Sequence, residues 1–273
     1  MTGSGRWAGQ TPGQRYDRLA LPFVRHYTRL LLNGTVVPDA GQVLDHGAGT
    51  GEVSLAIHRR HPTASVTALD PDPDLLAQLR VKAGSDAAWL AVVHGTLDTT
   101  SITIRADVVF SQLVLSLTTN PGHELAAMRA HTAPGGTLRA AVLAGPDRMR
   151  AFAAYWQAAS AVIPGALPAS AYPHLRFTRP DGLRQLALAA GWQQPRVKPA
   201  DTYRTATAAQ LWQWLSQTLP LYTAAGDVIA TDALSRARSD ALRRATLEHL
   251  GQYRNFGGHY EVPTGGWLLT AVA

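Results

Sequence analysis

The period of the hydrophobic positions changes along the chain. Between Gln14 and Asn33, apolar residues recur at spacings of three and four, which predicts one helix that ends at Asn33-Gly34. From Gln42 onward, short runs rich in β-branched residues alternate with amphipathic stretches. The expected strands are 42–45, 65–70, 89–94, 107–111 and 136–143, with helices at 51–61, 73–82 and from 121. This alternation predicts a parallel sheet with helices on both faces.

The alternation stops after Leu143. The pattern there predicts a helix within 147–175, a helix at 180–191, a strand at 196–204, mostly helix over 206–251 and a last strand at 267–272. We therefore expect an N-terminal helical segment (1–40), a nucleotide-binding core (41–146) and a remainder (147–273). Within that remainder, two insertions (147–175 and 206–260) form a helical cap.

Composition narrows the classes of protein. The chain has 273 residues, 46% hydrophobic and 16% charged, with seven tryptophans, which disfavours intrinsic disorder. It has no cysteine, so disulfides, zinc–thiolate sites and thiol nucleophiles are excluded. The first residues lack the apolar core of a signal peptide, and no run of about 18 apolar residues occurs. These features predict a cytoplasmic protein with no membrane partner.

The net charge of +6 and the isoelectric point near 10 raise the question of nucleic-acid binding. The densest basic segment lies around Arg243 and Arg244. There Asp240, Arg244 and Glu248 follow at four-residue intervals, as on a helix face that pairs its own charges in solvent. The charge alone therefore does not predict a nucleic-acid partner.

One segment indicates chemistry. Residues 43–51 read Val-Leu-Asp-His-Gly-Ala-Gly-Thr-Gly, a buried strand that ends in an acid and turns through glycines into a helix. The third glycine of a dinucleotide fingerprint would fall at Glu52, whose charge repels phosphates, and no Gly-Lys-Ser/Thr follows. Asp70 ends the next strand, where its carboxylate can accept hydrogen bonds from both hydroxyls of a ribose.

These residues resemble class I S-adenosylmethionine (SAM)-dependent methyltransferases, and within them the ubiquinone/menaquinone-methyltransferase-like branch that modifies small molecules. Five segments carry the resemblance in family order: 43–51, 68–71, 95–98, 107–112 and 133–138. The resemblance implies an α/β fold with a Rossmann-like, doubly wound, mostly parallel seven-stranded sheet and helical cap insertions. It also implies SAM as cofactor and S-adenosylhomocysteine as product.

By this resemblance, the methionine end of the cofactor lies in the glycine-rich loop and the ribose lies at Asp70. The adenine is flanked by the loop after the third strand, and Ser111 offers its carbonyl beside the sulfonium. The implied cofactor-binding set is Tyr16, Asp45, Gly47, Gly49, Thr50, Gly51, Asp70, Pro71, Thr96, Leu97, Asp98 and Ser111. Tyr16 can equally be a packing residue, and His46 is expected to be a partly buried structural histidine.

The acceptor and the catalytic groups are less defined. Some small-molecule O-methyltransferases place histidines after the fourth strand, but residues 113–117 contain none. The remaining candidates are Gln112, which can orient a polar acceptor, and His174 and His259, each of which can also be structural. No metal site is expected, because Ser111 and the segment around Asp147 do not supply the oxygen ligands that magnesium-dependent relatives use.

Aromatic side chains are concentrated in the expected cap, which predicts a bulky or aromatic small-molecule acceptor, such as a secondary metabolite. A homodimer is compatible with the sequence. Two other functions remain open. One is a nucleic-acid methyltransferase, although the Asn/Asp-Pro-Pro-Tyr/Phe motif of base-modifying relatives is missing after the fourth strand. The other is a noncatalytic SAM-binding protein or a cyclase that reuses the fold.

Overall fold

The computed structural model describes residues 9–223 and 225–273, and these form two compact units. The first unit comprises residues 1–142, 180–198 and 268–273, and the second comprises residues 143–179 and 199–267. The chain therefore passes from one unit to the other four times. The expected cap insertions, 147–175 and 206–260, both fall within the second unit.

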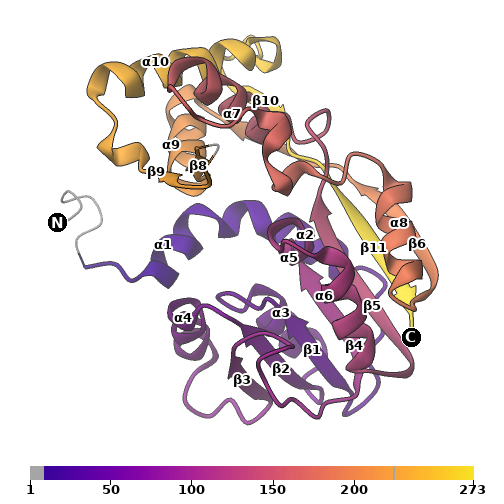
Figure 1. Cartoon of the computed structure of the whole chain (residues 1–273). Helices are drawn as coiled ribbons and strands as arrows, with labels where there is room; N and C mark the ends of the chain where they lie inside the picture. The colour runs from indigo at the N-terminus through magenta and orange to yellow at the C-terminus, as the bar shows by residue number, and fades with distance from the viewer. Residues whose placement is uncertain (1–8, 224) are drawn as a thin grey trace. The chain divides into compact units, whose positions relative to one another are not determined.

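The first unit contains a seven-stranded sheet in the order β3-β2-β1-β4-β5-β11-β6 (Figure 1). Its strands are β1 (Gln42–His46), β2 (Ser65–Asp70), β3 (Leu90–His94), β4 (Ala106–Gln112), β5 (Thr132–Leu143), β6 (Gln193–Ala200) and β11 (Gly266–Val272). The strands β3, β2, β1, β4 and β5 pair in parallel. Because the strand order reverses between β1 and β4, the carboxyl ends of these two strands border a ligand-binding crevice in folds of this kind. The predicted fold class is confirmed.

Helices flank this sheet, and several begin at the residues that the sequence indicates. They are α1 (Pro12–Leu19), α2 (Leu21–Leu32), α3 (Glu52–Arg60), α4 (Pro73–Ala83), α5 (Val114–Leu117), α6 (Pro121–Ala130) and α8 (Pro180–Ala189). Asp72 caps α4 by accepting hydrogen bonds from the backbone of Asp74 and Leu75, and Asn120 caps α6. A proline follows each of these caps, where its missing N–H costs nothing.

The prediction of one helix from Gln14 to Asn33 is wrong, because the chain forms α1 and α2 with a break at Ala20. The cause is Pro22, which lies in the first turn of α2. A proline inside a continuous helix would lack the N–H for its hydrogen bond, and its ring would clash with the carbonyl four residues earlier. Two helices therefore meet here at an angle that a single amphipathic pattern does not reveal.

The second unit is mostly helical. It comprises α7 (Arg150–Val162), the short 3₁₀ helices η1 (Ala169–Ala171) and η2 (Pro173–Leu175), β7 (Tyr203–Ala206), α9 (Ala208–Thr218), β8 (Leu221–Tyr222), β9 (Val228–Ile229), η3 (Thr231–Ala233), α10 (Arg236–His249), η4 (Gly251–Tyr253) and β10 (Tyr260–Pro263). The single strand expected at 196–204 is instead two strands, β6 in the large sheet and β7, which pairs antiparallel with β10. The segment 206–251 also contains an unpredicted hairpin of β8 and β9.

Aromatic side chains build the core of the second unit. Trp156 stacks on Tyr172 with ring centroids 4.0 Å apart, and its indole N–H donates to the Pro220 carbonyl. Phe152 packs edge-on against Trp156 and also contacts Trp214. All four of these rings are buried. Within the described residues, every helix is too short or too polar to cross a lipid bilayer.

Candidate functional site

The glycine-rich loop between β1 and α3 forms the centre of the site. Gly47, Gly49 and Gly51 all have positive φ, a conformation that favours glycine. A Cβ on Gly47 would lie 2.1 Å from Val114 Cγ2, so packing also requires glycine there. A Cβ on Gly49 would meet only Leu75, at 4.0 Å. The space beside Gly49 is therefore open, as expected where a ligand approaches the backbone.

Asp45 is the second-last residue of β1 and anchors the start of α3. Its Oδ2 accepts hydrogen bonds from the backbone N–H of Ser54 at 3.0 Å and from the Ser54 hydroxyl at 2.6 Å. The carboxylate is buried, and this burial raises the pKa of Asp45 to about 6, although the two bonds from Ser54 act in the opposite direction. Asp45 thus holds the loop against the helix that follows it.

Asp70 lies at the carboxyl end of β2, next to the same loop. Its Oδ2 accepts from the Gly49 N–H at 2.8 Å, and its Oδ1 accepts from the Asp72 N–H at 2.9 Å. Burial raises the pKa of Asp70, and the two backbone hydrogen bonds partly offset that effect. Because each carboxylate oxygen has more than one lone pair, both can still accept from a ligand's hydroxyls. The fold therefore places the Asp70 carboxylate and the backbone of the glycine-rich loop next to each other.

Helix α1 covers the loop. The Thr50 hydroxyl donates to Asp17 at 2.5 Å, and Lys82 donates to both Asp17 and Thr50. Burial and the nearby carboxylates of Asp70, Asp17 and Glu52 raise the pKa of Tyr16 to about 12. The cavity lined by Tyr16, Asp45, Gly47 and Gln112 measures only about 30 Å³, the share of one water molecule in the liquid. A nucleoside-sized ligand therefore requires α1 to move.

Gln112 and Ser111 end β4 beside the loop. The Gln112 side chain accepts from the Thr28 hydroxyl at 2.7 Å and donates to the Val24 carbonyl at 3.0 Å, so both ends of its amide bind α2. Ser111 is fully buried and pairs in register with His46 of β1. To orient an acceptor, as expected, Gln112 would therefore have to give up hydrogen bonds to α2.

Sequence reasoning missed the partner of His46. Its Nε2 lies 3.0 Å from Glu124 Oε2, and its Nδ1 lies 3.5 Å from Ser111 Oγ. His46 is buried, and its hydrogen bond with Glu124 lowers the pKa of that carboxyl. No local pattern connects a strand end with a residue of α6, so only the fold reveals this pair of a buried histidine and a half-buried carboxylate beside β4.

The remaining residues of the implied cofactor-binding set follow β2 and β3. Pro71 is exposed, and its carbonyl lies 3.1 Å from His94 Nε2. Leu97 is buried, while Thr96 takes part in a turn closed by the hydroxyls of Thr99 and Thr100. Asp98 forms an exposed ion pair with His123 of α6 at 2.9 Å. All four expected residues thus lie at the same edge of the sheet as Asp70.

The two histidine candidates for catalysis lie in the second unit. His174 belongs to η2, with its ring 5.6 Å from Trp156. Its Nδ1 is buried without a hydrogen-bond partner among the described residues, and burial lowers its pKa. His259 lies in a tight turn, where its Nδ1 is 3.2 Å from the Gly257 carbonyl and its N–H donates to Asn255. A catalytic role for either histidine stays a prediction.

The described residues contain no group of three or more His, Asp or Glu side chains that could hold a metal ion. The prediction of a metal-independent reaction awaits measurement.

Comparison with known proteins agrees with this site. Residues 43–136 match the family model described as a methyltransferase domain. A malonyl-[acyl-carrier protein] O-methyltransferase of Xylella fastidiosa is 34% identical over 111 residues, which are 39% of this chain and 36% of that protein. A trans-aconitate 2-methyltransferase of Streptomyces avermitilis is 34% identical over 129 residues, 45% of this chain and 47% of that protein. The chain thus spans a third to a half of these relatives' length.

The solved structures extend the likeness of fold beyond residues 43–136. A protein of Bacillus halodurans that was assigned as a methyltransferase shares the fold with a TM-score of 0.61 at 16% identity, covering 90% of this chain and 97% of that one. Structures of this fold have been solved with S-adenosylhomocysteine bound.

The sheet order and the glycine-rich loop define a nucleotide-binding α/β protein whose crevice lies at the carboxyl ends of β1 and β4. The family match then identifies its core as a methyltransferase domain of the class I, SAM-dependent type. The cofactor of this family is SAM. The residues present fit it, because Asp70 offers carboxylate oxygens at the strand edge and the space beside Gly49 is open.

Proposed function

We propose that this chain transfers the methyl group of SAM to a small-molecule acceptor. The observation that carries the proposal is the junction of Asp70 with the glycine-rich loop. There, a carboxylate at the end of β2 accepts from the backbone of Gly49, inside the segment that matches the methyltransferase domain. In this proposal, the end of β2 and the glycine-rich loop together form one ligand-binding surface.

In this proposal, Asp70 binds the ribose hydroxyls, and Asp45 with the loop of Gly47, Gly49 and Gly51 binds the methionine end. When bound, SAM supplies an electrophilic methyl group on its sulfonium. What the chain must then provide is alignment of the acceptor and exclusion of water. Tyr16 on α1 would close over the cofactor after it enters, and the hydrogen bond from Thr50 to Asp17 would hold α1 against the loop.

The methyl acceptor is less well defined than the cofactor. The expected bulky or aromatic acceptor was based on the cap aromatics, but Trp156 and Tyr260 are buried in the core of the second unit. The aromatic side chains that retain exposure there are Tyr203, Trp212, Tyr222, Tyr253 and Phe256. The names of the two curated relatives include malonyl and trans-aconitate, which are carboxylic acids. An acceptor screen should therefore contain both carboxylic acids and aromatic metabolites.

The test compares Asp70→Ala with Asp74→Ala, an exposed neighbour on α4. We expect S-adenosylhomocysteine to bind the wild-type chain in the micromolar range. Asp70→Ala should weaken it by at least about tenfold, because charge-assisted hydrogen bonds to two hydroxyls are lost. Asp74→Ala should leave the affinity unchanged. Isothermal titration calorimetry measures all three dissociation constants.

Methyl transfer is measured separately, with radiolabelled SAM and the acceptor panel. Unchanged affinity in Asp70→Ala would remove this residue from the site. Tight binding of the cofactor with no labelled product from any acceptor or cell extract would instead favour the noncatalytic alternative. Adding EDTA to the same assay tests metal independence, and we expect no loss of activity.

A further inference from the structure

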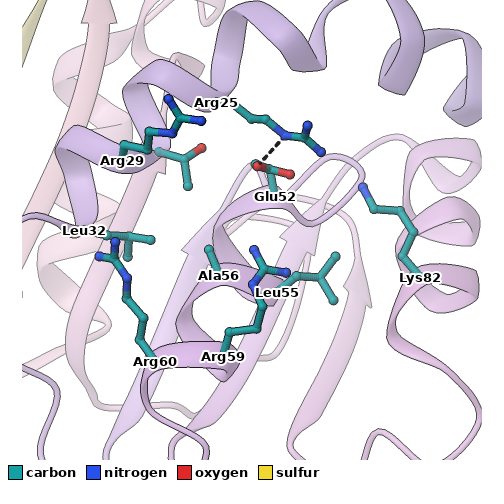
Figure 2. A pocket seen from close by; sticks show the side chains of 10 residues that line it. Arg25, Arg29, Leu32, Glu52, Leu55, Ala56, Arg59, Arg60 and Lys82 are labelled. Carbon is teal, nitrogen blue, oxygen red and sulfur yellow. Dashed lines mark hydrogen bonds and ion pairs between the residues drawn. The ribbon is translucent and has the colours of Figure 1, made fainter.

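A second cavity lies between α2 and α3, on the first unit, and measures about 530 Å³ (Figure 2). Its lining combines five basic side chains with a single acidic one. The lining residues are Arg25, Thr28, Arg29, Leu32, Glu52, Leu55, Ala56, Arg59, Arg60 and Lys82. We call this cavity the cationic groove. Among the described residues, it shares only Glu52 with the lining of the cofactor cavity.

Most of the charge in the cationic groove is not neutralised by the protein. Within the part of the chain that the structure describes, the side chains of Arg29, Arg59 and Arg60 have neither an ion pair nor a hydrogen bond. Arg25 binds Glu52 through its Nε at 3.0 Å, which leaves its two terminal nitrogens for a ligand. Lys82 is the exception, because Asp17 and Thr50 already bind it.

Fold stability explains only part of this arrangement. Arg59 and Arg60 lie in the last turn of α3 and Arg29 in the last turn of α2, where cations are favourable because of the helix dipole. That reason does not extend to Arg25, which comes from the first half of α2. Arg25 and Arg29 are also four residues apart on one helix face, a spacing at which like charges repel. Figure 2 shows arginines of both helices extending into the same space. A ligand with negative charge would relieve this repulsion.

The shape of the cationic groove favours a compact ligand. Leu32 and Ala56 are buried and Leu55 is half-buried, so the charged rim surrounds an apolar floor. Guanidinium groups bind phosphate and carboxylate oxygens in pairs of parallel hydrogen bonds. We propose that the cationic groove binds a small organic polyanion, one that carries phosphate or clustered carboxylate groups next to a short apolar part. This binding does not depend on methyl transfer.

The test uses calorimetry on the full chain at about 10 mM ionic strength, without cofactor, because exposed charges are screened at higher salt. Inorganic pyrophosphate and tricarballylate serve as probes, and their relative affinities distinguish a phosphate ligand from a carboxylate one. We expect the stronger probe to bind with a submillimolar dissociation constant. Arg29→Ala/Arg59→Ala should weaken it by at least about tenfold.

The matched control is Arg236→Ala/Arg238→Ala, which removes two exposed arginines from α10 and changes the net charge equally. We expect the control to bind like the wild type. Equal losses in both variants would show that net charge attracts the probe, and no submillimolar binding of either probe by the wild type would refute the cationic groove as a site.

Two further measurements complete the design. Arg29→Lys/Arg59→Lys keeps the charge but loses the paired hydrogen bonds, so we expect a clear loss of affinity even where the alanine variant misfolds. If the lysine variant binds as the wild type does, paired recognition is wrong. A short single-stranded RNA is titrated in parallel. If it binds more tightly than both probes and loses affinity in the groove variants, the groove is a nucleic-acid surface and the small-anion proposal fails.

Discussion

Asp45 and Asp70 are two buried carboxylates at the ends of neighbouring strands, and local spacing in the sequence predicts both. Each follows a hydrophobic strand and precedes a turn, so a one-dimensional pattern is enough to find them. The contacts of Gln112 with Thr28 and of His46 with Glu124 join residues that lie far apart in the chain. No local signal marks such pairs, and for that reason they cannot be predicted from the sequence.

Asp45→Asn should make the folded chain more stable and bind the cofactor more weakly. The folded chain holds the pKa of Asp45 at about 6, above its ordinary value near 3.8, so the fold favours the protonated acid. Its contribution to stability is therefore complete below about pH 4 and is lost as the pH rises through 6. Asparagine stays neutral and can still accept from Ser54. At pH 7.5, the free energy of unfolding of the variant should exceed that of the wild type by a value on the order of 1–3 kcal/mol. At pH 4, the two free energies of unfolding should be equal.

Urea unfolding at the two pH values measures this difference, with Asp74→Asn as the exposed control. Calorimetry should show weaker binding of S-adenosylhomocysteine by Asp45→Asn, because its ammonium group loses a carboxylate partner. A variant less stable than the wild type at pH 7.5 would mean that the bonds from Ser54 need the charge.

At the scale of elements, the strands and caps of the first unit were predicted to within a few residues. The failures have one local and one non-local cause, and the periodic pattern shows neither. Pro22 breaks a helix whose apolar spacing continues across the break, and the segment expected as one strand at 196–204 contains parts of two strands that belong to different sheets. Strand pairing is decided by partners distant in sequence, such as β10 for β7. A window of neighbouring residues does not contain that information.

Gly13→Ala should release α1 from the first unit. A Cβ at Gly13 would lie 2.4 Å from the Cβ of Gln78 on α4, too close for the two helices to keep their contact. Because alanine favours helix by about 1 kcal/mol, α1 itself should stay helical. We expect faster amide hydrogen exchange in residues 12–19 and faster association of S-adenosylhomocysteine, since Tyr16 and Asp17 then cover the loop less often.

Gly122→Ala provides the control for this variant, because a Cβ there would meet only ordinary contacts, at 3.6 Å or more. Hydrogen exchange followed by mass spectrometry and stopped-flow binding are the measurements. If Gly13→Ala leaves both unchanged, α1 does not govern access to the cofactor cavity.

At the scale of the whole molecule, each of the two units has its own buried core. The first is built on the parallel strands, with Val43, Leu44 and Phe110 fully buried, and the second on stacked aromatic rings. Concentration of aromatics in one half of a sequence does not reveal whether they line a cavity or fill a core. Here, the rings of Trp156 and Tyr172 fill a core.

Trp156→Ala should therefore unfold the second unit and leave the first folded. Removal of a buried tryptophan costs about 3–5 kcal/mol, and the Pro220 carbonyl also loses its donor. We expect a separate, earlier melting transition, loss of methyl transfer and nearly unchanged affinity for S-adenosylhomocysteine. Calorimetric melting and binding measure these effects, with Phe256→Ala as a fully exposed aromatic control. A single transition with equal losses of binding and transfer would show that the two units fold as one.

Strand β11 lies between β5 and β6 in the sheet, although it follows both in the chain. While the ribosome synthesises this protein, β6 emerges with no neighbour to bind, because the strand that joins it to β5 is residues 266–272. The sheet therefore has to keep an open edge until that stretch leaves the exit tunnel. An exposed strand edge recruits other strands, so nascent chains stalled between residues 200 and 265 are the species that chaperones should hold most often.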